Sequence, residues 1–215
     1  MADVKTVRHD MRQLTRSTYA RGVKILQRRD PVLGKVVSEY GVPPMWEREP
    51  GFPTLLRIML EQQVSLASAK AVFDKTAAAS NRLDPGQFLQ FSDASLKGFG
   101  FSRQKIGYGR NIAEALRRGE LRLEQLGRMS TLSVREELMK IKGIGSWTAD
   151  IYILMALGRQ DAWPSGDLAL ATGVQELKCL RSRPSPEKLE ILSRRWIPWR
   201  SVAARIIWHY YLNHR

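Results

Sequence analysis

Two stretches near the middle of the chain decide its fold: Ile141-Lys142-Gly143-Ile144-Gly145-Ser146-Trp147-Thr148-Ala149 and Trp163-Pro164-Ser165-Gly166-Asp167. In the first, a helical pattern is interrupted by Gly-x-Gly and resumes at Ser146, which predicts two helices joined by a tight turn. Such a turn places backbone N–H groups at a helix N-terminus, where the partial positive charge attracts an anion. In the second, a turn precedes a single carboxylate, Asp167. A simple helix connection and a simple N-cap would show the same patterns, so both interpretations remain open here.

Helical periodicity extends outward from these stretches over almost the whole chain. Leu56, Leu60, Val64, Ala67 and Ala71 follow the spacing of one helix face. No alternation of apolar and polar residues is long enough to predict a strand. The predicted fold class is therefore all-α, with Gly- and Pro-rich breakers dividing the chain into about nine or ten segments.

Several helix starts are visible in the sequence. Asp30 before Pro31 and the Gly51-Phe52-Pro53 run each predict one, because proline suits a first helical turn. Ser102 is expected to be an N-cap. Ser133, which Glu136 follows three residues later, is expected to be another because the pair has the form of a capping box.

Composition bounds the partners. The chain has 215 residues, 43% of them hydrophobic, which is enough for one domain or two small lobes sharing a core. Its formal net charge of +14 favours a polyanionic partner, because phosphates neutralised by Lys and Arg release counterions. The basic residues are spread along the chain, which indicates a basic face on a folded body.

The same composition excludes several kinds of site. One cysteine, Cys179, rules out an internal disulfide and a four-cysteine iron–sulfur cluster, and three scattered histidines argue against a zinc site. The N-terminus has no apolar core of a secretory signal, and no stretch is long enough for a membrane span. We expect a cytoplasmic protein whose chemistry needs no metal.

In order along about residues 30–210, five motifs resemble those of the helix-hairpin-helix (HhH-GPD) DNA glycosylases. They are Gly51 to Ser65 with its Gln62-Gln63 pair, Gly100 to Lys105, Ile141 to Ala149, Trp163 to Asp167, and Trp196-Ile197-Pro198-Trp199-Arg200 continuing to Trp208. The last looks like the 3-methyladenine DNA glycosylase II (AlkA-like) branch. We expect a minimal helical form, because the chain is too short for the extra N-terminal β-domain found in some alkylation-repair members.

The resemblance implies two helical lobes with an active-site cleft between them. One lobe, about 52–157, would be a six-helix barrel with the hairpin, and the other would combine about 1–51 with 158–215. It also implies a monomer that acts on double-stranded DNA containing damaged bases, with no cofactor and no membrane partner. In a bacterium the protein would be associated with the nucleoid.

The resemblance also assigns residues. Asp167 would be the catalytic carboxylate, in preference to Asp150 inside the second hairpin helix and Asp161 in the preceding loop. The base pocket would be lined by Trp147, Ile151, Leu168 and Trp208. DNA contacts would come from Gln62, Gln63, Ser102, Lys105, Lys142, Gly143, Ile144, Gly145, Ser146 and Thr148. A monovalent cation on the hairpin backbone at Ile141 and Gly143 is left open, and no other metal is expected.

Departures from the family pattern refine the function. Relatives that also cleave the DNA backbone carry a Schiff-base Lys where this chain has Trp147, so the resemblance implies a monofunctional glycosylase that uses water and has no lyase activity. Ile151 and Leu168 replace frequent aromatics, which predicts a less aromatic pocket. The substrate would be alkylated bases of the 3-methyladenine and 7-methylguanine type. A glycosylase for uracil, hypoxanthine or an oxidised purine, and a noncatalytic DNA-binding protein, remain alternatives.

Two further expectations concern single side chains. Gln63 occupies the family's wedge position, which fills the gap left by an extruded base, although periodicity alone would run one helix through Gln62 and Gln63. Of the six tryptophans, Trp196 and Trp199 are expected in the core.

Overall fold

A computed structural model of the chain describes residues 11–214. Within that range the backbone forms thirteen α-helices and one 3-10 helix, and the only β-type pairing is an isolated bridge between Gln13 and Arg159. The predicted all-α class is confirmed. The expected number of segments was too low, because α6 (Pro85–Gln90), α7 (Asp93–Phe99) and α9 (Leu123–Leu126) are too short to show a periodic pattern. No helix of residues 11–214 combines the length and the apolar character that crossing a membrane requires.

The chain divides into two compact units. Unit 1 comprises the described residues up to Glu47 and those from Ile153 onward, and unit 2 is Arg48–Tyr152. Unit 1 contains α2 (Arg16–Arg29), α3 (Pro31–Tyr40), α12 (Leu168–Leu177), α13 (Pro186–Ser193), the 3-10 helix η1 (Arg194–Trp196) and α14 (Arg200–Asn213).

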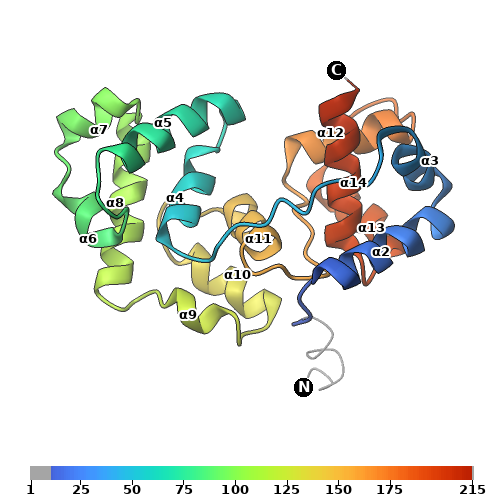
Figure 1. The fold of residues 1–215 in the computed structure, drawn as a ribbon, viewed down its shortest axis with the longest axis horizontal. Helices are drawn as coiled ribbons and strands as arrows, with labels where there is room; N and C mark the ends of the chain where they lie inside the picture. The colour runs from blue at the N-terminus through green and yellow to red at the C-terminus, as the bar shows by residue number, and fades with distance from the viewer. Residues whose placement is uncertain (1–10, 215) are drawn as a thin grey trace. The chain divides into compact units, whose positions relative to one another are not determined.

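Helix α14 is the centre of unit 1. It packs against α2, α3 and α12, as Figure 1 shows for the red helix and its blue and orange neighbours. Glycines let these helices approach closely: a Cβ at Gly22 would lie 2.6 Å from the Trp199 ring, and one at Gly173 would lie 2.6 Å from Ile207. Trp196 and Trp199 are buried, which confirms their expected place in the core.

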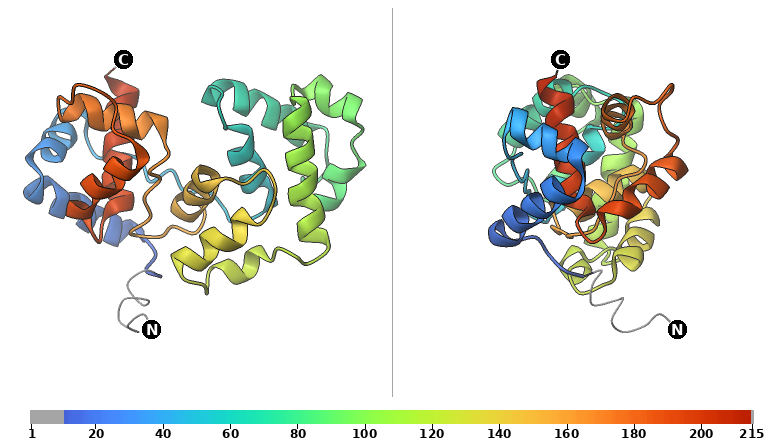
Figure 2. Two further views of the ribbon diagram at one scale, coloured as in Figure 1. Left: turned by 180° about the vertical axis from the view of Figure 1, so that it is seen from behind. Right: turned by 90° about the vertical axis from the view of Figure 1, so that its right-hand side faces the viewer.

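Unit 2 is organised around α4 (Phe52–Leu60) and α8 (Arg103–Arg117). These two helices pack on each other, with α5 (Leu66–Ala78) beside α4 and with α6 and α7 beside α8, and Figure 2 shows α8 from behind. Helix α4 has six buried apolar residues in nine, so it supplies much of the unit's core. The unit is completed by α9, α10 (Thr131–Met139) and most of α11 (Ser146–Met155).

The helix starts test the expected caps. Asp30 and Ser102 accept backbone hydrogen bonds as N-caps of α3 and α8, as predicted. The prediction for Ser133 was wrong. Ser130 caps α10 and accepts from the backbone N of Ser133, which is therefore the third residue of the helix. The spacing of the apolar residues Leu132 and Val134 does not show that α10 starts three residues before the predicted position.

Candidate functional site

The hairpin of unit 2 joins α10 to α11 through the turn predicted from the sequence. Gly143 has φ +110, and a Cβ there would lie 2.5 Å from a ring carbon of Tyr108, so both backbone conformation and space require glycine. Ile144 is buried and its N donates to Ile141 O over 3.0 Å. At Gly145 nothing lies within 4 Å of a built Cβ, and both Gly145 and Lys142 are exposed. The turn therefore presents open backbone at the N-terminus of α11.

A second loop of unit 2 lies between α4 and α5, where periodicity alone predicted a continuous helix. Helix α4 ends at Leu60, and Gln63 adopts a left-handed φ of 55 with an exposed side chain. The Lys105 ammonium donates to Leu60 O over 2.6 Å and to Gln62 O over 3.0 Å. Burial lowers the pKa of Lys105. A cation from α8 thus satisfies the carbonyls that the broken helix leaves open.

The loop and the hairpin are joined by a side chain. The Gln62 amide donates to Gly143 O over 3.0 Å and to the Thr148 hydroxyl over 2.7 Å. Thr148 is only 1% exposed. Of the residues expected to contact DNA, Gln62, Lys105 and Thr148 therefore make contacts within the protein, whereas the Gln63 side chain is exposed.

The two hairpin carbonyls considered for a cation both accept hydrogen bonds: Ile141 O from Ile144 N, and Gly143 O from Gln62. Each carbonyl has a second lone pair, and neutral oxygens suit a hard monovalent cation, so the donor set fits one. Among residues 11–214, no three His, Cys, Asp or Glu side chains gather as a metal site would require.

Asp167 belongs to unit 1, where it is the N-cap of α12. Its Oδ1 accepts from Leu170 N over 2.7 Å and from the indole N–H of Trp208 over 2.9 Å. The carboxylate is 8% exposed and Trp208 is 7% exposed. The capping interpretation of Asp167 was therefore right, and the same carboxylate touches a tryptophan from the expected base pocket.

The other expected pocket residues differ in burial. Ile151 is buried and Trp147 is half-buried, both on α11. Leu168, at the first position of α12, is 64% exposed.

Contacts also separate Asp167 from the two competing acids. Asp150 lies 3.2 Å from the Arg135 guanidinium, and Asp161 lies 3.0 Å from that of Arg200. Asp161 also accepts from the backbone N of Arg200. Asp150 and Asp161 thus each lie beside a guanidinium, and Asp167 accepts hydrogen bonds from a helix start and from Trp208.

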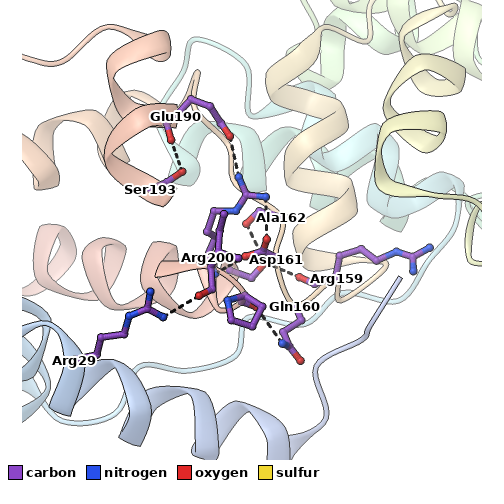
Figure 3. A network of polar contacts seen from close by, with 11 residues as sticks. Arg29, Arg159, Gln160, Asp161, Ala162, Glu190, Ser193 and Arg200 are labelled. Atoms are coloured by element: carbon purple, nitrogen blue, oxygen red, sulfur yellow. Dashed lines mark hydrogen bonds and ion pairs between the residues drawn. The ribbon is translucent and has the colours of Figure 1, made fainter. Parts of the chain in front are cut away.

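The loop that leads to Asp167 is anchored on the start of α14, in the network of Figure 3. Arg200 pairs with Asp161 and with Glu190, over 3.0 and 2.8 Å. The Ser201 hydroxyl donates to the carbonyls of Arg159 and Ala162, over 2.5 and 3.1 Å. The Trp-x-Pro-Trp-Arg stretch thus has a structural role, because its last residue and the serine after it hold the loop that precedes Asp167.

Sequence reasoning did not find the anchoring role of Arg200, nor did it single out Trp46. The ring of Trp46 lies edge-to-face with Trp208, with 6.5 Å between the centroids and 68° between the planes. No motif marks Trp46, and an isolated aromatic in a Pro-rich segment has the pattern of ordinary packing.

Known proteins resemble the chain over most of its length. It is 30% identical over 182 residues to DNA-3-methyladenine glycosylase 1 of Schizosaccharomyces pombe, which covers 82% of this chain and 79% of that protein. A solved structure of the S. pombe 3-methyladenine DNA glycosylase in complex with abasic DNA has a TM-score of 0.83 at 28% identity and covers 87% of this chain and 95% of its own. A DNA-3-methyladenine glycosidase from Bacillus halodurans has a TM-score of 0.72 at 29% identity and covers 90% of both chains.

The hairpin, the Asp167 loop and most of the helices between α4 and α14 fall inside a single family profile. Residues 56–199 match the HhH-GPD superfamily base excision DNA repair protein. That match spans more than half of the chain. The chain therefore belongs to the HhH-GPD superfamily of base excision DNA repair proteins.

Proposed function

We propose that this protein is a monofunctional DNA glycosylase of base excision repair that hydrolytically removes alkylated bases, of the 3-methyladenine and 7-methylguanine type, from duplex DNA. The observation that carries the proposal is Asp167, held at the start of α12 against the indole N–H of Trp208. Support comes from the relatives, which are named for 3-methyladenine and of which one is bound to abasic DNA.

DNA binding would begin at the phosphates. The hairpin offers the open backbone at Gly145 and the N-terminus of α11 to a phosphate, while surface Lys and Arg supply nonspecific attraction in keeping with the +14 charge. The exposed Gln63 would enter the duplex where the damaged nucleotide is extruded, and the extruded base would meet the Trp208 ring.

Hydrolysis of the N-glycosidic bond of an alkylated base requires few protein groups apart from a correctly positioned carboxylate. Methylation at N3 of adenine or N7 of guanine makes the base cationic. When the bond between sugar C1′ and the base nitrogen breaks, its electron pair leaves on the base, which departs neutral without a general acid. The Asp167 carboxylate would stabilise the oxocarbenium-like sugar and accept a proton from the water that attacks C1′. The products are a free base and an abasic site.

The test is single-turnover base release from methylated duplex DNA, with strand scission scored before and after alkali. Wild type should release 3-methyladenine and 7-methylguanine, and breaks should appear only after alkali. Asp167→Asn should bind DNA normally and release base at least about 100-fold more slowly. Asp74→Asn, an exposed acid of α5 paired with Lys70, is the matched control and should behave as wild type.

Two results would overturn the proposal. Wild-type release by Asp167→Asn would remove the catalytic assignment. Tight DNA binding with no release of methylated bases would point to another lesion and, if a panel of uracil, hypoxanthine and oxidised purines were also inert, to a noncatalytic DNA-binding protein.

A further inference from the structure

Trp46 has a backbone conformation that its side chain does not favour. It lies in unit 1, within the non-helical run that follows α3, and its φ is 47. Bulky L-residues rarely adopt this left-handed region, and holding one there costs about 1–3 kcal/mol. Such a conformation persists only where the surroundings enforce it, and it is enriched at functional sites.

Buried polar side chains enforce it here. The Tyr19 hydroxyl donates to Pro43 O over 2.9 Å, and the Arg205 guanidinium donates to Met45 O, the carbonyl next to Trp46. Arg205 and Tyr19 also lie together, with 6.0 Å from the guanidinium carbon to the ring centroid. Burial lowers the pKa of Arg205 to about 10, so the group remains a cation at neutral pH and its hydrogen bonds to carbonyls are charge-assisted. Side chains from two helices, α2 and α14, thus hold the segment that carries Trp46.

The ring so fixed is one contact away from the catalytic carboxylate. Trp46 meets Trp208 edge-to-face at 6.5 Å and lies 6.4 Å from the His209 ring, while Trp208 donates to Asp167. Trp46 is half-buried, so part of its ring surface remains accessible. An edge-to-face pair of indoles presents two π surfaces at a steep angle, and each carries the negative quadrupole that attracts cations.

We propose that Trp46 is a specificity-determining residue whose ring contacts the extruded base and favours cationic methylated purines over neutral ones. The proposal rests on the proposed function and deepens it, because it locates discrimination in a residue outside the expected pocket of Trp147, Ile151, Leu168 and Trp208. The Trp46 ring would also supply an aromatic surface in place of the aromatic side chains that are absent at Ile151 and Leu168. Trp46 acts on the base, whereas Asp167 acts on the sugar.

The experiment compares Trp46→Leu and Trp46→Phe with wild type in single-turnover release of 7-methylguanine, a cation in DNA, and hypoxanthine, a neutral purine. Loss of a cation–π contact should lower 7-methylguanine release by Trp46→Leu about 10-fold, with hypoxanthine release changed less than about 3-fold. Trp46→Phe, which keeps a π face, should recover most of the discrimination. A merely structural role would lower both rates together and would not be rescued selectively.

A positioning control uses the residue that holds the segment. Tyr19→Phe removes the hydrogen bond to Pro43 O and leaves the Trp46 ring intact, so it should weaken the preference for 7-methylguanine by a smaller factor than Trp46→Leu. Equal release rates for the Trp46→Leu and wild-type enzymes on 7-methylguanine would overturn the inference and leave the proposed function standing.

A binding measurement separates this inference from the proposed function. If wild type releases no methylated base, the proposed function is contradicted. The role of the Trp46 ring can still be decided by measuring how 7-methylguanosine and guanosine quench tryptophan fluorescence. At slightly acidic pH, where the methylated base is cationic, wild type should bind 7-methylguanosine several-fold more tightly than guanosine, and Trp46→Leu should lose that preference. The same preference in both proteins would exclude Trp46.

Discussion

The hairpin of unit 2 and the Asp167 loop of unit 1 are both tight connections, but they are held by different forces. The hairpin is shaped by Gly143 lying against the Tyr108 ring and by neutral hydrogen bonds from Gln62. The Asp167 loop is held by the Arg200–Asp161 ion pair and by the Ser201 hydroxyl, from residues about forty positions further along the chain. The backbone conformation of the hairpin is set within Gly-x-Gly by the positive φ of Gly143, and Tyr108 and Gln62 then pack on it from elsewhere in unit 2. The Asp167 loop has no such local determinant and depends on the start of α14.

The difference suggests how each loop should respond to substitution. A locally determined turn has no alternative once its glycine is lost, so one Cβ is enough to break it. A loop held by several distant contacts should lose stability in steps, with a measurable coupling between the partners.

The largest effect is expected at the hairpin, where Gly143→Ala both overpacks Tyr108 and forces a positive φ on alanine. We expect a loss of about 3 kcal/mol or more in the free energy of unfolding, measured by urea denaturation, together with loss of DNA binding. Gly145→Ala is the matched control because its Cβ meets nothing. It should cost less than about 1 kcal/mol yet still weaken DNA binding, because the added methyl blocks the approach of a phosphate. Similar unfolding free energies for the two variants would contradict the packing argument.

A smaller effect is expected at the Asp167 loop. Arg200→Met leaves the largely buried Asp161 without its guanidinium partner, which should cost about 1–3 kcal/mol and slow base release through displacement of Asp167. The double variant with Asp161→Asn should recover part of that loss, and the double-mutant cycle should give a coupling of about 1 kcal/mol or more. Simple additivity of the two single losses would show that the ion pair does not hold the loop.

The smallest effect distinguishes the two lysines expected at the DNA. Lys142 is exposed on the hairpin, so Lys142→Met should reduce the slope of log affinity against log salt by about 0.9 if it neutralises one phosphate. Lys105 holds the carbonyls of Leu60 and Gln62, so Lys105→Met should leave that slope unchanged. It should instead slow base release, because the loop that carries Gln63 is loosened. A reduced salt slope for Lys105→Met would assign it to phosphate binding.

The contrast between local and distant contacts also explains how far the sequence alone could lead. The hairpin and the caps at Asp30, Ser102 and Asp167 were predictable because each is encoded within a few residues. The break after Leu60 was not predictable from periodicity, because Val64 continues the apolar spacing of α4. The break depends on Lys105, which lies on another helix, and on the left-handed φ of Gln63. Neither feature alters the apolar spacing along α4.

What the sequence analysis missed has two causes, a local ambiguity and long-range contacts. Ser133 resembled a capping box, but Ser130 is the N-cap of α10, and no local rule ranks the two serines. Trp46 offers no signal at all, because its conformation is set by Tyr19 and by Arg205 on the last helix.

Arg205 has one more consequence, for the topology of the chain. Its guanidinium donates to Met45 O, just before the chain leaves unit 1, to Leu154 O, just after the chain returns, and to Ser201 O on its own helix. One side chain therefore acts as a noncovalent clasp across the two ends of an inserted segment. The loop that it closes contains all of unit 2. The entropic cost of closing such a loop grows only slowly with its length. Unit 2 is in this sense a long insertion in unit 1, and a short linker from Glu47 to Ile153 should still allow the clasp to form.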